Sequence, residues 1–239
     1  MADARPRRRH SVGVSGANTL TIGIHFELIC PWCFIGKRQL DLARERFARQ
    51  FPGGPVASLW HPVQLLPDVP EQGLPFAEFY ERRLGSAEAV QRRRQQIDSA
   101  ARSIGLELDL TGIQRMPNTA RAHRLLRQVA ALGEPALYEA LLDRLFAGYF
   151  QLGEDIGNGV TLSKLAAEAG MPPDRPGDAT PDDAKPGAYA VQTGSAVPGV
   201  PHFLFNGRVS LSGAHDAAIL FEAMSRAVQQ SIAADRACA

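Results

Sequence analysis

Cys30-Pro31-Trp32-Cys33 is the stretch around which the rest of this sequence is arranged. Residues 20–29, LTIGIHFELI, are rich in β-branched side chains and predict a buried strand. Residues 34–44, FIGKRQLDLAR, change to helical spacing, and only Gly36 weakens that pattern. A strand followed directly by C-x-x-C at the start of a helix is the setting in which this motif performs thiol–disulfide chemistry.

The start of a helix gives this placement a physical reason. Unpaired backbone N–H groups and the positive end of the helix dipole stabilise a thiolate, which is the reactive form of cysteine. Pro31 fits the first turn because it has no N–H to leave unpaired and its φ is already close to helical. We therefore expect Cys30 to be the nucleophile and Cys33 to be its resolving partner.

Two other interpretations of the cysteine pair stay open. A zinc site needs four ligands, and the one further cysteine, Cys238, lies next to the C-terminus. Two inert cysteines on a helix are the other alternative. We predict neither a metal site nor a cofactor, because the histidines of the globular region lack the spacing of a zinc module: His25, His61, His123, His202 and His215.

Composition indicates an ordinary globular protein of one domain with an insertion, or of two small domains. The chain has 239 residues, of which 45% are hydrophobic and 21% charged. A net charge of +1 gives no electrostatic reason to expect nucleic-acid binding, and no apolar run is long enough to span a membrane. Residues 1–18 form a basic tail that we expect to be disordered and that lacks the apolar core of a signal peptide. Three cysteines without a signal favour the reducing cytoplasm.

Further strand signals follow the motif and also close the chain. Residues 56–63 predict a second strand, in which Pro62 indicates a sheet edge or a strand end. Residues 202–211 predict a hairpin, because Asn206-Gly207 separates two short apolar runs. Residues 216–233 then predict an amphipathic helix.

Between these strands, residues 75–170 have a helical pattern. The expected helices are a short one around residues 76–84, one at 86–104, and others starting near 117, 134 and 161. Within them we expect His123 at the surface or at a cap, and residues 92–94, three arginines, on a solvated face. Residues 171–187 hold five prolines among Asp and Gly and predict a linker.

This order of elements describes an α/β protein with a thioredoxin fold and a large all-helical insertion. A β-α-β half and a β-β-α half are separated by the helical region. We expect the thioredoxin-like part to comprise residues 19–72 and 188–233, and the insertion with its proline-rich linker to comprise residues 73–187.

The sequence resembles the DsbA-like branch of the thioredoxin superfamily and, within it, the FrnE-like oxidoreductases. The resemblance extends over about residues 21–228, and it is specific because several motifs agree in order. They are CPWCFIGKR at 30–38, QLLPD at 64–68, PNTARAHRLL at 117–126, Tyr149-Phe150, residues 153–157, Gly199-Val200-Pro201 and LSGA at 211–214. Residues 173–187 depart from the family, which usually has a short helix there.

The resemblance implies that Pro201 is a cis-proline beside the cysteines. A proline there would leave the Val200 backbone free to pair with an extended substrate segment. Pro31 and Trp32 would contact the same substrate. An ordinary trans proline at the start of the next strand is the alternative for Pro201.

Two ionisable residues near the motif have more than one interpretation. Glu27 would orient the helix start or move protons for Cys33, or would simply be solvated. His202 has the sequence position to favour a thiolate if it were protonated, but we expect a plain surface histidine.

These observations predict thiol–disulfide exchange through a mixed disulfide. The expected partners are protein clients that contain disulfides or thiols, with glutathione as a further candidate. A glutathione-dependent isomerase or a kappa-class glutathione transferase is one alternative, although those enzymes usually have serine at the position of Cys30. A redox-gated client-binding protein is the other alternative. We expect Cys238 to be dispensable, because it has no partner at a recognisable spacing.

Overall fold

The computed structural model describes residues 19–172 and 198–237. Three predictions concern residues outside these ranges: the basic tail at 1–18, the linker from 173 to 187, and the role of Cys238. Within the described part of the chain, no helix is both long and apolar enough to cross a lipid bilayer.

A four-stranded mixed sheet, in the order β2-β1-β5-β6, carries the predicted thioredoxin fold. β1 (Leu20–Phe26) pairs in parallel with the edge strand β2 (Val56–Pro62), and α1 (Pro31–Gln50) connects the two. β5 (His202–Phe205) runs antiparallel to β1 and forms a hairpin with β6 (Val209–Ser212). As predicted, Pro62 ends an edge strand, where its missing N–H leaves no ladder bond unmade.

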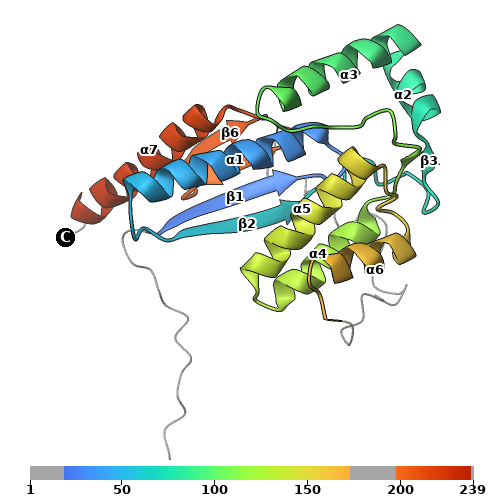
Figure 1. Cartoon of the computed structure of the whole chain (residues 1–239). Helices are drawn as coiled ribbons and strands as arrows, with labels where there is room; N and C mark the ends of the chain where they lie inside the picture. The colour runs from blue at the N-terminus through green and yellow to red at the C-terminus, as the bar shows by residue number, and fades with distance from the viewer. Residues whose placement is uncertain (1–18, 173–197, 238–239) are drawn as a thin grey trace, which may run out of the picture.

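Helices α1 and α7 (Ala217–Ala237) cover one face of this sheet, as Figure 1 shows. Alternating residues of β1, including Ile22 and Ile24, point toward these helices together with Phe203 and Phe205 of β5. Leu40, Ala43 and Phe47 of α1 and Leu220 and Met224 of α7 complete this apolar layer. The burial of this layer fixes α1, and with it the cysteine motif, against the end of the sheet.

A helical block is inserted between the two halves of the sheet, as the sequence predicted. It contains α2 (Phe76–Leu84), α3 (Ala87–Arg102), α4 (Ala120–Ala131), α5 (Pro135–Leu152) and α6 (Gly159–Glu168). The block also contains a short antiparallel ribbon of β3 (Leu74–Pro75) and β4 (Arg115–Met116), which the sequence did not predict. In Figure 1, α4, α5 and α6 lie beside β2, and α2 and α3 extend beyond the carboxyl end of β1.

Several element boundaries differ from the predicted ones. β1 ends at Phe26 instead of continuing to Ile29, because Cys30 N–H donates to the Glu27 carbonyl in a turn. α4 begins at Ala120 and not near Pro117, because the Asn118 side chain accepts from Ala120 N–H and holds the preceding residues as a loop. Local side-chain to backbone bonds of this kind move the ends of elements without changing the fold.

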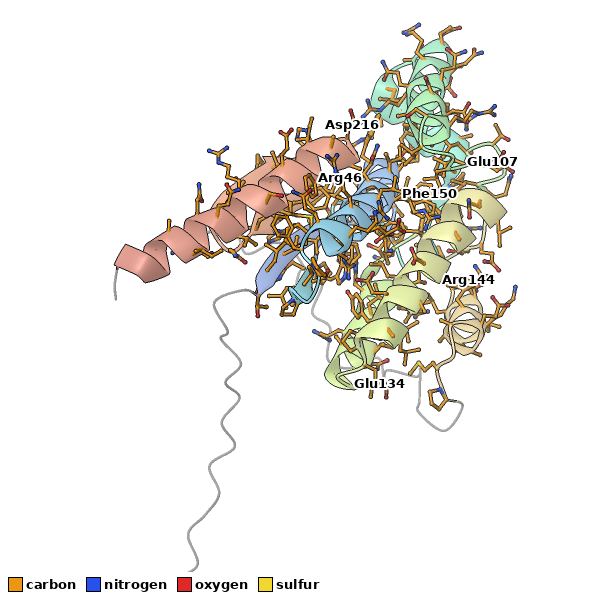
Figure 2. All side chains as sticks on the ribbon, turned by 60° about the vertical axis from the view of Figure 1, so that its left-hand side comes forward. Arg46, Glu107, Glu134, Arg144, Phe150 and Asp216 are labelled. Carbon is orange, nitrogen blue, oxygen red and sulfur yellow. The ribbon has the colours of Figure 1, made fainter. Side chains whose placement is uncertain are left out.

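The helical block packs against α1 through aromatic side chains. Phe34, directly after the cysteine motif, stacks on Phe146 with ring centroids 5.1 Å apart and on Phe150 at 6.1 Å. Figure 2 shows Phe150 on α5 at the place where that helix meets α1 and the α2–α3 pair. The cysteine motif therefore lies at the junction of the sheet and the helical block.

Candidate active site

The two cysteines occupy the first turn of α1, directly after the loop that follows β1. Cys30 is the N-cap residue, with extended backbone angles of φ −93° and ψ 110°, and Pro31 occupies the first helical position. Cys33 N–H donates to the Cys30 carbonyl at 2.9 Å, and both thiols are free. Cys30 is 9% exposed and Cys33 2% exposed, so the residue that opens the helix is the more accessible one.

The pKa values of the two thiols move in opposite directions. A hydrogen bond from the Cys33 side chain lowers the pKa of Cys30 below its ordinary value of 9.0, in spite of burial, and the N–H groups of Cys33 and Trp32 lower that pKa further. Burial raises the pKa of Cys33 well above 9.0, and the adjacent Cys30 raises it again. This asymmetry favours the thiolate at Cys30 and the protonated thiol at Cys33.

The Val200-Pro201 segment lies across from Cys30, as the resemblance implied. The Val200–Pro201 peptide bond is cis, and the Cys30 thiol faces the Val200 carbonyl with 3.8 Å between sulfur and oxygen. Gly36 of α1 makes this approach possible, because a Cβ atom at that position would lie 2.9 Å from Pro201 Cγ. The glycine that weakened the predicted helix pattern therefore has a packing role.

A fully buried carboxylate, Glu27, lies beneath the cysteines, so the solvated alternative is wrong. Its carboxylate accepts from Leu28 N–H at 2.6 Å, from Leu65 N–H at 2.9 Å and from the Thr119 hydroxyl at 3.1 Å. His123 Nε2 lies 2.9 Å from the same carboxylate. Four polar partners on one carboxylate compensate for the loss of its hydration.

His123 is the clearest error of the sequence predictions. It is fully buried on α4 and not at the surface, because α4 turns it toward Glu27 at the end of β1, 96 residues earlier in the chain. Its Nδ1 has no hydrogen-bond partner within residues 19–172 and 198–237. The signal that could have indicated this pair is the polar Thr119 and His123, one helical turn apart, beside the apolar face of α4.

Glu27 is connected to both thiols. Its backbone N–H donates to Cys33 Sγ at 3.4 Å. Its negative charge acts to raise the pKa of Cys33 and also that of Cys30, although it is a smaller influence than the contacts between the two thiols. The carboxylate therefore influences both thiols through its charge.

The helical block contributes residues to the site that the sequence did not indicate. The Arg93 guanidinium lies over the Trp32 ring at 5.6 Å, and Arg94 lies over Phe76 at 5.9 Å. The predicted solvated arginine face therefore holds for Arg93, which is exposed, and is wrong for Arg94, which is half-buried. Tyr80 lies close by, and burial raises its pKa, with a further rise from the charge of Cys30.

Three histidines are aligned across the sheet near the same end of β1. His25 stacks on His61 with ring centroids 4.7 Å apart and approaches His202 at 5.7 Å, because the strand register places these residues side by side. His202 Nδ1 also lies 2.7 Å from the Ser212 hydroxyl. Burial lowers the pKa of His202, so a protonated His202 is disfavoured. The described residues include no group of three or more His, Cys, Asp and Glu side chains arranged to hold a metal ion.

Comparison with known proteins shows the family to which this chain belongs. The family model of the DSBA-like thioredoxin domain matches residues 21–225. The uncharacterized protein YwbO of Bacillus subtilis (strain 168) is 24% identical over 153 residues, which is 64% of this chain and 68% of that protein.

Solved structures share the fold. A probable DsbA oxidoreductase from Streptomyces coelicolor has a TM-score of 0.68 at 24% identity, with 87% of this chain and 89% of the other covered. A putative protein disulfide isomerase from Nitrosomonas europaea gives 0.58 at 14% identity, and a 2-hydroxychromene-2-carboxylate isomerase gives 0.53 at 13%. For both, the match covers 89% of this chain and 98% of the other.

Proposed function

Because the chain belongs to the DSBA-like thioredoxin domain family, we propose that it is a thiol–disulfide oxidoreductase that exchanges disulfides with protein clients. One observation carries this proposal: the opposite pKa directions of Cys30 and Cys33 at the start of α1. The thiol with the lowered pKa is the more accessible one, and the thiol with the raised pKa is buried behind it. This arrangement suits a nucleophile and a resolving partner.

The reaction takes two exchange steps. In the first, the Cys30 thiolate attacks one sulfur of a client disulfide, a Cys30–client disulfide forms, and the other client sulfur leaves as a thiolate. In the second, Cys33 loses its proton and attacks Cys30 Sγ, so that a Cys30–Cys33 disulfide forms and the client leaves with both sulfurs reduced. The same steps in reverse transfer the disulfide to a reduced client.

Glu27 is the proton acceptor for the second step in this proposal. Cys33 retains its proton until Cys30 is bound to the client, and the buried Glu27 carboxylate acts electrostatically on both thiols. His123 and Thr119 hold that carboxylate in place, which makes them positioning residues.

The client would bind along the Val200-Pro201 segment. The Val200 carbonyl that faces the Cys30 thiol is the support for this placement, since an extended client chain there would present its sulfur to Cys30. Pro31 and Trp32 would contact the client from the other side of the nucleophile. We place the reaction in the cytoplasm, because three cysteines in 239 residues leave little basis for structural disulfides.

The test is a trapping experiment in which insulin, with its disulfides intact, is the client of the reduced protein. Cys33→Ser should accumulate a mixed disulfide through Cys30, whereas Cys30→Ser should form none and Cys238→Ser should behave as the unchanged protein. Trapping through Cys33, or no trapping at all, would contradict the assignment.

A glutathione-dependent isomerase is the second candidate, and the structural likeness to a hydroxychromene-carboxylate isomerase is the observation that favours it. Retained glutathione-dependent isomerisation in Cys33→Ser, without any client trapping, would replace the proposed function with this one. Client binding that follows the redox state without turnover would instead identify a redox-gated binding protein.

A further inference from the structure

A narrow hollow opens in the helical block directly beside Cys30. Ile29 and Pro31, the two neighbours of Cys30 in the sequence, form one wall. Tyr80 of α2 and Phe150 of α5 also line the hollow, and Figure 2 shows Phe150 where α5 meets α1. The cavity volume is about 30 Å³, so the hollow excludes an aromatic ring and admits no more than a narrow aliphatic stem.

Two arginines of α3, Arg93 and Arg94, line the same hollow. Arg93 donates a long hydrogen bond of 3.4 Å to Gln96 on its own helix, and no carboxylate among the described residues pairs with either guanidinium. By contrast, Arg102 on the same helix pairs with Asp98 at 3.0 Å. Among the described residues, these two guanidinium groups therefore have aromatic rings beside them but no negative charge.

Two further observations indicate that this charge is directed toward a ligand. Arg94 Nε is buried and has no hydrogen-bond partner in the part of the chain that the structure describes. Arg83, Arg93 and Arg94 all lie close enough to Tyr80 for their charges to oppose the rise that burial causes in its pKa. A buried guanidinium N–H without a partner is costly unless a ligand supplies an acceptor.

We propose that this hollow is a subsite for a glutamate side chain of a protein client, and this inference rests on the proposed function. The two methylene groups of the glutamate pack between the apolar walls, and its carboxylate accepts from Arg93 and Arg94. Since Ile29 and Pro31 flank Cys30, the glutamate belongs to a residue within one or two positions of the reacting client cysteine. A lysine at that position of the client is repelled by the same guanidinium groups.

The test uses three disulfide-bonded peptides that differ only in one residue next to the cysteine: Glu, Gln or Lys. With the unchanged protein, the Glu peptide should form the mixed disulfide with Cys30 about tenfold faster than the Gln peptide, as expected for one charge-assisted hydrogen bond. The Lys peptide should react more slowly than either. In the double variant Arg93→Gln, Arg94→Gln, the ratio of Glu to Gln rates should fall to about one.

Arg92→Gln is the matched control, because Arg92 is on the same helix but lines a different part of the surface. It should keep the preference for the Glu peptide. Equal rates for the Glu and Gln peptides with the unchanged protein, or a preference that survives the double variant, would overturn the subsite while leaving the proposed function intact. If no peptide exchanges at all, the proposed function itself fails.

The last part of the experiment uses glutathione disulfide, a small molecule whose carboxylates could bind to the same two arginines. If the double variant slows the reaction with glutathione disulfide as much as the reaction with the Glu peptide, the assignment to a protein client is wrong. A slowing confined to the Glu peptide supports it.

Discussion

At the scale of single residues, the site depends on how differently the fold treats two cysteines that are three positions apart. Cys30 is the N-cap residue of α1, and its pKa is lowered chiefly by the Cys33 side chain. Cys33 lies one step deeper, where burial raises its pKa. The negative charge of Glu27 acts to raise the pKa of both thiols. Removing that charge should therefore lower both pKa values.

Replacing Glu27 by Gln should shift the alkylation of Cys30 to lower pH. The unchanged protein should show half-maximal reactivity below pH 9.0, because the pKa of Cys30 is lowered from that value. Removal of a nearby negative charge favours the thiolate further, so the midpoint should fall again in Glu27→Gln. The measurement is the iodoacetamide reaction rate as a function of pH, with the labelled cysteine identified by mass spectrometry.

Glu78→Gln is the matched control, since Glu78 is an exposed carboxylate of α2. It should leave the midpoint unchanged. An upward shift in Glu27→Gln would mean that the carboxylate acts on Cys30 through its hydrogen bonds and not through its charge.

At the scale of elements, the site depends on how closely the first turns of α1 approach the segment before β5. Gly36 is a poor residue for a helix interior, and yet it lies two residues after Phe34 in α1. Pro201 fills the space where a side chain at position 36 would lie, and Phe203 is 3.3 Å from the place that a Cβ atom of residue 36 would take. The lower helix propensity of glycine is thus offset by a contact that holds Val200 beside Cys30.

Gly36→Ala should destabilise the fold and slow disulfide exchange together. The added methyl group would push Pro201 away from α1, and overpacking of this kind costs about 1–3 kcal/mol of unfolding free energy. Because the Val200 carbonyl moves with Pro201, the contact with Cys30 should lengthen as well. Denaturant unfolding gives the stability, and insulin reduction gives the exchange rate.

Gly159→Ala is the control for this change, because it is also a helical glycine but nothing lies within 4 Å of its Cβ position. Alanine there should be neutral or slightly stabilising. If Gly36→Ala behaved in the same way as Gly159→Ala, the close approach of Pro201 would have no energetic role.

At the scale of the whole molecule, ion pairs as well as aromatic contacts hold the helical block against the thioredoxin-like part. Lys37 of α1 is 2% exposed and contacts Asp143 of α5 at 2.8 Å, Asp41 at 3.1 Å and Glu139 of α5 at 3.5 Å. Burial alone would lower the pKa of Lys37, but these three carboxylates raise it. The lysine therefore stays charged and binds the block to α1 one turn after the cysteines.

Lys37→Met should lower the unfolding free energy by about 3 kcal/mol. This value is at the low end of the cost of removing one partner from a buried ion pair, because the carboxylates around Lys37 are partly exposed. The loss arises from negative charges that are left close together without a cation. Denaturant unfolding at neutral pH measures it.

Lys164→Met serves for comparison, since Lys164 also bridges two carboxylates, Glu154 and Glu168, but is 59% exposed. Its removal should cost no more than about 1 kcal/mol. Equal effects of the two substitutions would show that burial adds nothing to the Lys37 contacts.

The sequence by itself determined the order of elements and the position of the cysteines. Strand alternation, helix periodicity, the Asn206-Gly207 turn and Pro31 after Cys30 are local signals, since each depends on residues within a few positions of one another. They were sufficient for the thioredoxin fold, the helical insertion and a pair of cysteines at the start of a helix. The resemblance to a known family added the cis bond before Pro201, which no local signal indicated.

Only the tertiary structure decided which distant residues complete the site. His123 meets Glu27 across 96 positions, and Arg93 reaches Trp32 from a helix that the sequence left solvated. Periodicity reports which side of a helix is apolar, but it carries no information about which polar group of another element lies opposite. A charge such as Glu27 or Lys37 is tolerated in the interior only where such partners meet it, so its burial becomes visible once the chain is folded.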